Sequence, residues 1–306
     1  MLSNMQQERI ANILRWVVRI CLHLILFAPL IITAYFYFPA IFPKVVYVRL
    51  LVEIALIAYI PLIILAPQYR PRMNLVTFLV VVFAFLVVIT SITGINFQYS
   101  LWGNYERMDG IFTWAHLWVL FLISGSVLKN KQEWLWLFGT SLVVAVAVSG
   151  YGFLQAAGSS LVFESGTTRI TGSIANPGFL AAYLLMNIGF AFFIILDQHA
   201  RRILRILAGV ALVIFIVAFA LTGIRGAFMG LLIGTLSFFV GHTIWVASRA
   251  VRKITIPVFL VIFLVVVGLF AMRESEFVSQ NKFLQPFFSL SLDQATIQTR
   301  LISWQG

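Results

Sequence analysis

Long apolar segments, repeated along the chain, limit what this sequence can fold into. A chain that is 61% hydrophobic and only 10% charged has more apolar surface than one soluble core of 306 residues can bury. The sequence therefore predicts an all-α, polytopic transmembrane helix bundle of about nine spans. Each predicted span is long enough to cross the roughly 30 Å hydrocarbon core as a helix; the nine segments cover residues 16–38, 46–66, 75–95, 111–128, 133–157, 178–196, 203–222, 225–246 and 254–272.

Two regions follow from this count. Residues 1–272 form the predicted bundle, and the less apolar residues 273–306 are expected to begin a large periplasmic segment that continues beyond Gly306. The first apolar segment is too long for a cleaved signal peptide and lacks a clear small-residue cleavage site. We therefore interpret it as a retained anchor.

Positive charge alternates along the connections between the predicted spans. By the positive-inside rule, the basic connections face the cytoplasm, so the N-terminus is predicted to be cytoplasmic. The formal net charge of +11 then reflects topology, and we do not expect nucleic acid as a partner. The basic connections carry Arg9 and Arg15; Arg70 and Arg72; Lys129 and Lys131; Arg201, Arg202 and Arg205; and Arg249, Arg252 and Lys253.

The remaining arginines of interest all map to the opposite, outer face. They are Arg107, Arg169, Arg225 and Arg300. Arginine stays charged in proteins, and its planar fork of donors suits phosphate. We therefore expect an anionic, phosphorylated lipid as substrate. The single cysteine, Cys21, and the scattered histidines predict no disulfide, metal site or cofactor.

Two outer connections combine these arginines with other polar groups. Residues 96–110, NFQYSLWGNYERMDG, carry aromatic, amide and charged side chains that suit sugar and phosphate; the alternative is an interfacial loop in which Arg107 pairs with Glu106 or Asp109. In the next outer loop, Asn176 before Pro177 predicts an N-cap with proline at the first helical position. That helix terminus favours an anion near Arg169.

The short turn at residues 221–226 places Arg225 at the membrane boundary, where it either snorkels or binds phosphate. Deeper in the predicted spans, Glu53 follows Arg49 by four residues. This spacing predicts an intrahelical ion pair, with a proton relay as the alternative. For His116 we expect a hydrogen-bonded structural histidine, with a catalytic role as the alternative.

Four segments, in order, resemble the signature segments of the O-antigen ligase and polymerase superfamily: YERMDG at 105–110, TRITGSIANPGFLAAYL at 168–184, LTGIRGAFMGLL at 221–232 and TRLISWQG at 299–306. The resemblance implies about a dozen spans and metal-independent transfer of a glycan from undecaprenyl pyrophosphate to an acceptor. It implies that Arg225 and Arg300 engage the donor pyrophosphate. Arg107, Arg169, Tyr105 and Asn176 complete the predicted substrate site.

These expectations define a bacterial inner-membrane enzyme of lipopolysaccharide biosynthesis whose site faces the periplasm. Lipids, proteins and glycans all remain possible acceptors, and both ligation and polymerisation fit the pattern. The family's histidine base would lie beyond Gly306. Two other classes stay open: a secondary transporter or flippase that uses Glu53 and Arg49, and a non-catalytic membrane scaffold.

Overall fold

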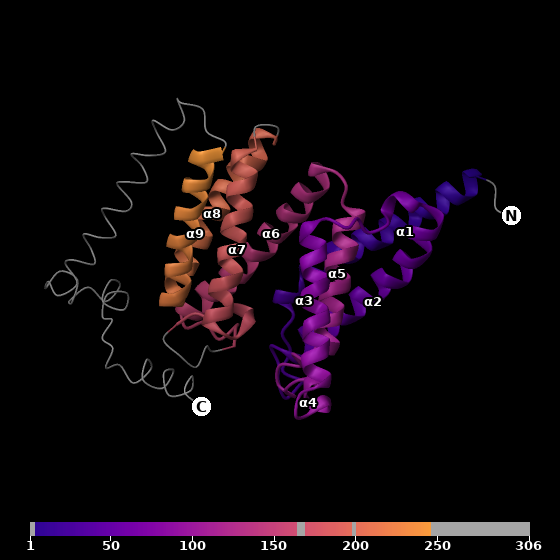
Figure 1. Cartoon of the computed structure of the whole chain (residues 1–306). Helices are drawn as coiled ribbons and strands as arrows, with labels where there is room; N and C mark the ends of the chain where they lie inside the picture. The colour runs from indigo at the N-terminus through magenta and orange to yellow at the C-terminus, as the bar shows by residue number, and fades with distance from the viewer. Residues whose placement is uncertain (1–3, 164–168, 198–199, 246–306) are drawn as a thin grey trace, which may run out of the picture. The chain divides into compact units, whose positions relative to one another are not determined.

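The computed structural model describes residues 4–163, 169–197 and 200–245, and these residues are helical with connecting turns (Figure 1). Three short 3₁₀ helices accompany the α-helices: η1 (Ala28–Leu30), η2 (Pro67–Tyr69) and η3 (Gly172–Ile174). The α-helices are α1 (Asn4–Ile25), α2 (Phe42–Leu65), α3 (Leu75–Ile92), α4 (Phe97–Trp102), α5 (Ile111–Val127), α6 (Lys131–Ala156), α7 (Pro177–Leu196), α8 (Arg202–Thr222) and α9 (Arg225–Trp245).

The chain divides into two units, residues 1–222 and 223–306. Helices α1 to α8 belong to the first unit, and α9 belongs to the second. Within the described residues, five helices are long and apolar enough to cross a membrane: α2, α3, α6, α7 and α8. Helix α5 and the apolar stretch Gly226–Thr235 of α9 are shorter. The helical membrane character is thus confirmed, whereas the count of nine stays a prediction, and its last segment, 254–272, lies outside the described residues.

The first predicted span, residues 16–38, is wrong as a single helix. Helix α1 begins earlier, at Asn4, and ends at Ile25, and residues 31–41 form turns and irregular backbone. Pro29 and Pro39 explain the break, because proline has no N–H to donate and disfavours helical backbone in the residue before it. The apolar composition of the segment predicted a span, but Pro29 lies within the segment and Pro39 directly follows it.

Two groups of helices bury most of the described core. In the first, α1, α2 and α5 pack around Val18, Ala55, Leu62 and Val127. In the second, α6, α7 and α8 pack together, and their buried side chains include the large Phe215 and the small Ala191 and Ala208. Small side chains allow helix backbones to approach closely, which is the usual way helices associate in a membrane.

Contacts within the first unit separate the basic connections from the others. At one end, Glu133 accepts a hydrogen bond from Arg15 and pairs with Arg19, and Lys131 pairs with Asp197 at 2.8 Å. At the other end, Lys44 donates to the carbonyl of Ser173, and Ile170 donates to Leu221. For these connections the alternation of charge corresponds to two ends of the first unit, and the assignment of the basic end to the cytoplasm stays a prediction. The basic connection at 249–253 lies outside the described residues.

Candidate functional site

The arginine loop, residues 103–110, is closed by two glycines whose backbones touch. Gly103 has φ +76°, and a Cβ there would lie 2.6 Å from the amide nitrogen of Asp109. A Cβ on Gly110 would lie 2.5 Å from the amide nitrogen of Gly103. Only glycine at both positions allows the ends of the loop to approach this closely.

Hydrogen bonds within the arginine loop hold its shape. The side-chain oxygen of Asn104 accepts from the amide of Glu106 at 2.8 Å, and its carbonyl accepts from the amide of Met108 at 2.7 Å. The amide of Asn104 in turn donates to the Asp109 carboxylate at 3.4 Å. The loop is therefore organised before any ligand binds, which lowers the entropic cost of binding.

A polar cavity of about 460 Å³ lies between the arginine loop and the ends of α3, α4 and α5. Its size falls within the range of about 300–1,000 Å³ typical of small-ligand sites. The lining combines a guanidinium group, two carboxylates, hydroxyls, an amide and an indole, in Ser91, Tyr99, Ser100, Asn104, Glu106, Arg107, Asp109 and Trp114. This set of groups suits a sugar phosphate: donors for phosphate, acceptors for hydroxyls and flat apolar rings for a sugar face.

Arg107 is exposed and forms no ion pair with any carboxylate in the described part of the chain. The alternative expectation, a pair with Glu106 or Asp109, is therefore not met. Asp109 instead accepts from the backbone of Asn104. Tyr105 is 94% exposed and does not line the cavity, so its role in substrate binding stays a prediction.

Arg49 of α2 fastens the arginine loop to the bundle. Its buried guanidinium donates to the carbonyl of Met108 at 3.2 Å and to the hydroxyl of Thr113, and it lies 4.9 Å from the ring centroid of Phe112. Thr113 also donates to the carbonyl of Met108. Arg49 is thus an anchor for the loop that carries Arg107.

Arg49 and Glu53 form no direct ion pair among the described residues, so the predicted pair is wrong as a direct contact, although the two charges still interact. Glu53 Oε1 lies 3.1 Å from Nε2 of His116 on α5, and His116 Nδ1 lies 2.6 Å from the carbonyl oxygen of Phe112. The spacing of four residues predicted that Arg49 and Glu53 are partners within α2. Helix α5 instead supplies Thr113 as a partner for Arg49 and His116 as a partner for Glu53. The expectation of a hydrogen-bonded His116 is confirmed.

The second outer loop is organised from the end of α6. The side-chain oxygen of Gln155 accepts from the amides of Thr171 and Gly172 at 3.1 and 2.9 Å. Arg169, two residues earlier, is exposed. Asn176 caps α7 by accepting from the amides of Gly178 and Phe179, with Pro177 at the first position, as predicted. Its cap role is therefore confirmed, and its role toward substrate stays a prediction.

Helix α2 connects both outer loops. Lys44 donates to Ser173 in the second loop, and Arg49 donates to Met108 in the arginine loop. The two anchors are five residues apart, about 7.5 Å along the helix. The loops that carry Arg107 and Arg169 are therefore fastened to the same part of α2. Arg225 begins α9 in the other unit and its side chain is not described, and Arg300 lies outside the described residues.

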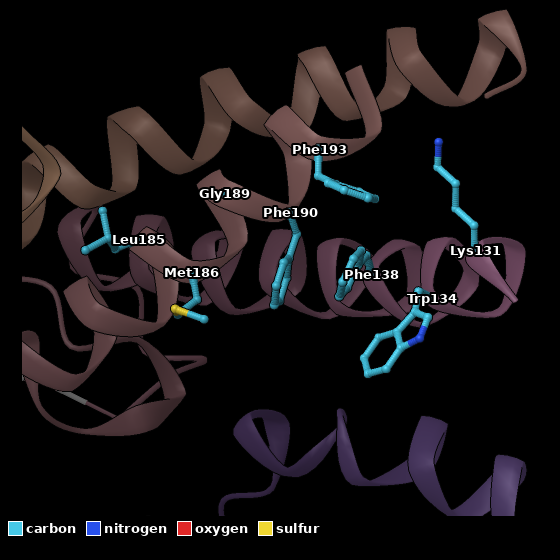
Figure 2. A pocket seen from close by; sticks show the side chains of 8 residues that line it. All are labelled: Lys131, Trp134, Phe138, Leu185, Met186, Gly189, Phe190 and Phe193. Carbon is cyan, nitrogen blue, oxygen red and sulfur yellow. The ribbon is translucent and has the colours of Figure 1, made fainter. Parts of the chain in front are cut away.

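Sequence reasoning missed an apolar groove of about 580 Å³ between α6 and α7 (Figure 2). Its walls are Trp134, Phe138, Leu185, Met186, Gly189, Phe190 and Phe193, with Lys131 at one end. The rings of Phe138 and Phe190 stack at 4.4 Å, and Lys131 pairs with Asp197. Because the groove is apolar and its cation already has a carboxylate partner, it does not resemble a phosphate site. The i, i+4 spacing of Trp134 and Phe138 was the available signal.

Gln155 and Lys44 were also missed as organisers of the outer loops. An amide at the end of an apolar helix and a lysine near the start of one were the only signals, and neither predicts a partner far along the chain. In the part of the chain that the structure describes, no group of three or more His, Cys, Asp or Glu side chains is placed to hold a metal ion.

No protein-family model, curated protein or solved structure matches this chain. The family resemblance therefore rests on the signature segments of the sequence alone.

Proposed function

We propose that this protein is a membrane glycosyltransferase that transfers a glycan from undecaprenyl pyrophosphate to a lipid, protein or glycan acceptor on the periplasmic face of the inner membrane. The observation that carries the proposal is the arginine loop: an arginine without a described carboxylate partner lines a polar cavity at the end of the bundle opposite the basic connections. The signature segments in the sequence support the same assignment.

The cavity supports a glycan donor more specifically than it supports a simple anion. Arg107 supplies a permanent positive charge for phosphate. Glu106 and Asp109 line the same space, and carboxylates accept hydrogen bonds from sugar hydroxyls. Trp114 adds an aromatic face of the kind that packs against the apolar side of a ring. A site for free phosphate would need Arg107, but it would not need the carboxylates of Glu106 and Asp109 or the indole of Trp114.

In the proposed reaction, the oxygen of an acceptor hydroxyl forms a bond to the anomeric carbon of the glycan as the bond from that carbon to the pyrophosphate oxygen breaks, with inversion. The departing undecaprenyl pyrophosphate keeps the electron pair, and a base takes the hydroxyl proton. Arg225 and Arg300 are assigned to the pyrophosphate, where fixed positive charge stabilises the growing negative charge. Removing one such preorganised donor commonly costs about 10²- to 10³-fold in rate.

The test is glycan transfer in membranes that contain the complete protein and an undecaprenyl pyrophosphate-linked glycan. We expect Arg107→Ala to reduce transfer about 10²-fold and Arg225→Ala and Arg300→Ala to abolish it, at normal membrane expression. Arg107→Lys retains charge but not the fork, so we expect partial activity. The control is Arg72→Ala, an exposed arginine of the basic connections. Full transfer by Arg107→Ala and Arg225→Ala would refute the proposal.

One observation favours a second function, a proton-coupled transporter or flippase. Glu53 of α2 and His116 of α5 form a pair within helices that we expect to span the membrane. Ionisable residues at membrane depth often mark ion or substrate pathways. Uptake by proteoliposomes would distinguish the two functions. Accumulation of substrate that is lost in Glu53→Gln, together with intact accumulation in Arg107→Ala, would favour transport.

A further inference from the structure

The contacts of His116 determine where its protons must lie. Nδ1 is 2.6 Å from the carbonyl oxygen of Phe112, and a carbonyl oxygen only accepts hydrogen bonds. Nδ1 must therefore carry a hydrogen. On the other side of the ring, Nε2 is 3.1 Å from Oε1 of Glu53.

A second proton must then lie between Nε2 and Glu53. Either the imidazole is positively charged and donates to the carboxylate, or a neutral imidazole accepts from a protonated carboxyl group. In both cases the pair holds one proton more than a neutral imidazole beside a carboxylate would. The side chain of Glu53 is 49% exposed at the surface of the helices, whereas that of His116 is only 11% exposed.

Loss of that proton makes the contact unfavourable. The lone pair of Nε2 would then face the lone pairs of the Glu53 carboxylate, with no hydrogen between two acceptors. Glu53 needs another donor, and one is available on its own helix. Nε of Arg49 is buried without a hydrogen-bond partner among the described residues, one helical turn before Glu53. Side chains four residues apart on a helix are neighbours.

We propose that Glu53 and His116 form a proton-binding site at the α2–α5 interface, and that Glu53 exchanges His116 for Arg49 when the proton leaves this pair. Arg49 also donates to Met108 and Thr113 and so anchors the arginine loop. The guanidinium is rigid and planar, so turning Nε toward Glu53 also turns Nη2 away from Met108 and Thr113. Proton loss therefore loosens the loop that carries Arg107. This inference does not rest on the proposed glycan transfer, since it follows from the contacts alone.

The surroundings leave few other groups to produce such a response. Helix α3, which packs against α5, has no titratable side chain. His23 of α1 is engaged with Thr140, and Lys44 of α2 is engaged with Ala40 and Ser173. The remaining titratable or charged groups on the elements packed against α2 and α5, and on the arginine loop, are Glu8, Arg9, Arg15, Arg19, Cys21, Tyr47, Tyr59, Tyr69, Tyr99, Tyr105, Glu106, Arg107 and Asp109.

The first test is the protonation of the ring. In the complete chain with ¹⁵N-labelled histidine, the His116 resonances are identified by their loss in His116→Gln. Spectra are recorded from about pH 5 to 8. We expect Nδ1 to carry a hydrogen throughout, since it faces a carbonyl oxygen. An Nδ1 that lacks its hydrogen would overturn the proton-binding geometry.

The second test is the mobility of the arginine loop. A nitroxide label is placed on Tyr105→Cys in a Cys21→Ala background, and its electron paramagnetic resonance spectrum is recorded over the same pH range. We expect the label to become more mobile as pH rises, and this response to be lost in Glu53→Gln and in His116→Gln. The same label on Gln132→Cys, an exposed site at the basic end, is the control and should not respond.

The outcomes separate cleanly. If the label responds to pH equally in Glu53→Gln and His116→Gln, another group causes the response and the proposal is overturned. The proposal is also overturned if the label shows no pH response in the protein that keeps both Glu53 and His116. Glu53→Gln keeps the size of the side chain and one hydrogen bond to the ring, and His116→Gln gives an independent second variant. Neither measurement involves a glycan, so failure here is distinct from failure of the proposed function.

Discussion

Substitution of Gly103 by alanine should open the arginine loop without changing any charge. Gly103 has φ 76° and ψ −166°, a region that is essentially restricted to glycine, and occupying it with another residue costs about 1–3 kcal/mol. The added Cβ would also lie 2.6 Å from the amide nitrogen of Asp109, and overpacking of this kind costs about 1–3 kcal/mol more. The two costs add to about 2–6 kcal/mol, and about 3 kcal/mol, in the lower half of that range, corresponds to about a 100-fold change in an equilibrium constant.

We expect the structural change to stay local, because Gly103 and Gly110 both lie in the short connection between α4 and α5. The assay is amide hydrogen exchange at Met108, whose N–H donates to Asn104. We expect exchange about 100-fold faster in Gly103→Ala, since exchange follows the population of the locally open state. The matched control is Gly125→Ala, an exposed helical glycine with open space around it, which should leave Met108 unchanged. Equal protection of Met108 in Gly103→Ala and wild type would refute the reasoning.

Three further predictions concern the caps and the basic end. Asn176→Ala removes the cap of α7 and should lower stability by about 1 kcal/mol in thermal denaturation, while Asn176→Asp keeps the cap and should not. Glu133→Gln leaves Arg15 without its buried carboxylate and should cost about 3–5 kcal/mol by denaturant titration; a loss below about 1 kcal/mol would contradict this. Burial, with the charge of Arg72, lowers the pKa of Lys129. The unfolded chain then binds this proton more tightly, so stability should rise with pH between the lowered pKa and the ordinary value near 10.4, and Lys129→Gln should flatten that rise.

Most helix boundaries were predictable because their signals are local. The apolar runs gave α2, α3, α5, α6, α7, α8 and α9 within a few residues, and the Asn176–Pro177 pair marked the start of α7. The first segment failed for an equally local reason, since its hydropathy outweighed Pro29 and Pro39 in the prediction. The site was predictable only as a set of loops. That Arg107 lines a cavity depends on the approach of Gly103 to Gly110, which leaves no periodic trace in the sequence.

The sequence by itself determined the helices, their membrane character and the alternation of basic and non-basic connections, because hydropathy, charge and capping act over a few neighbouring residues. The tertiary structure alone decided the partners of Arg49, Glu53 and His116. Residues four apart on one helix are always available to each other, but a neighbouring helix offers donors and acceptors whose positions depend on packing. In the structure, Glu53 pairs with His116 on the neighbouring helix. Arg49, the partner that the spacing predicted, is the one to which we propose Glu53 moves when the proton leaves.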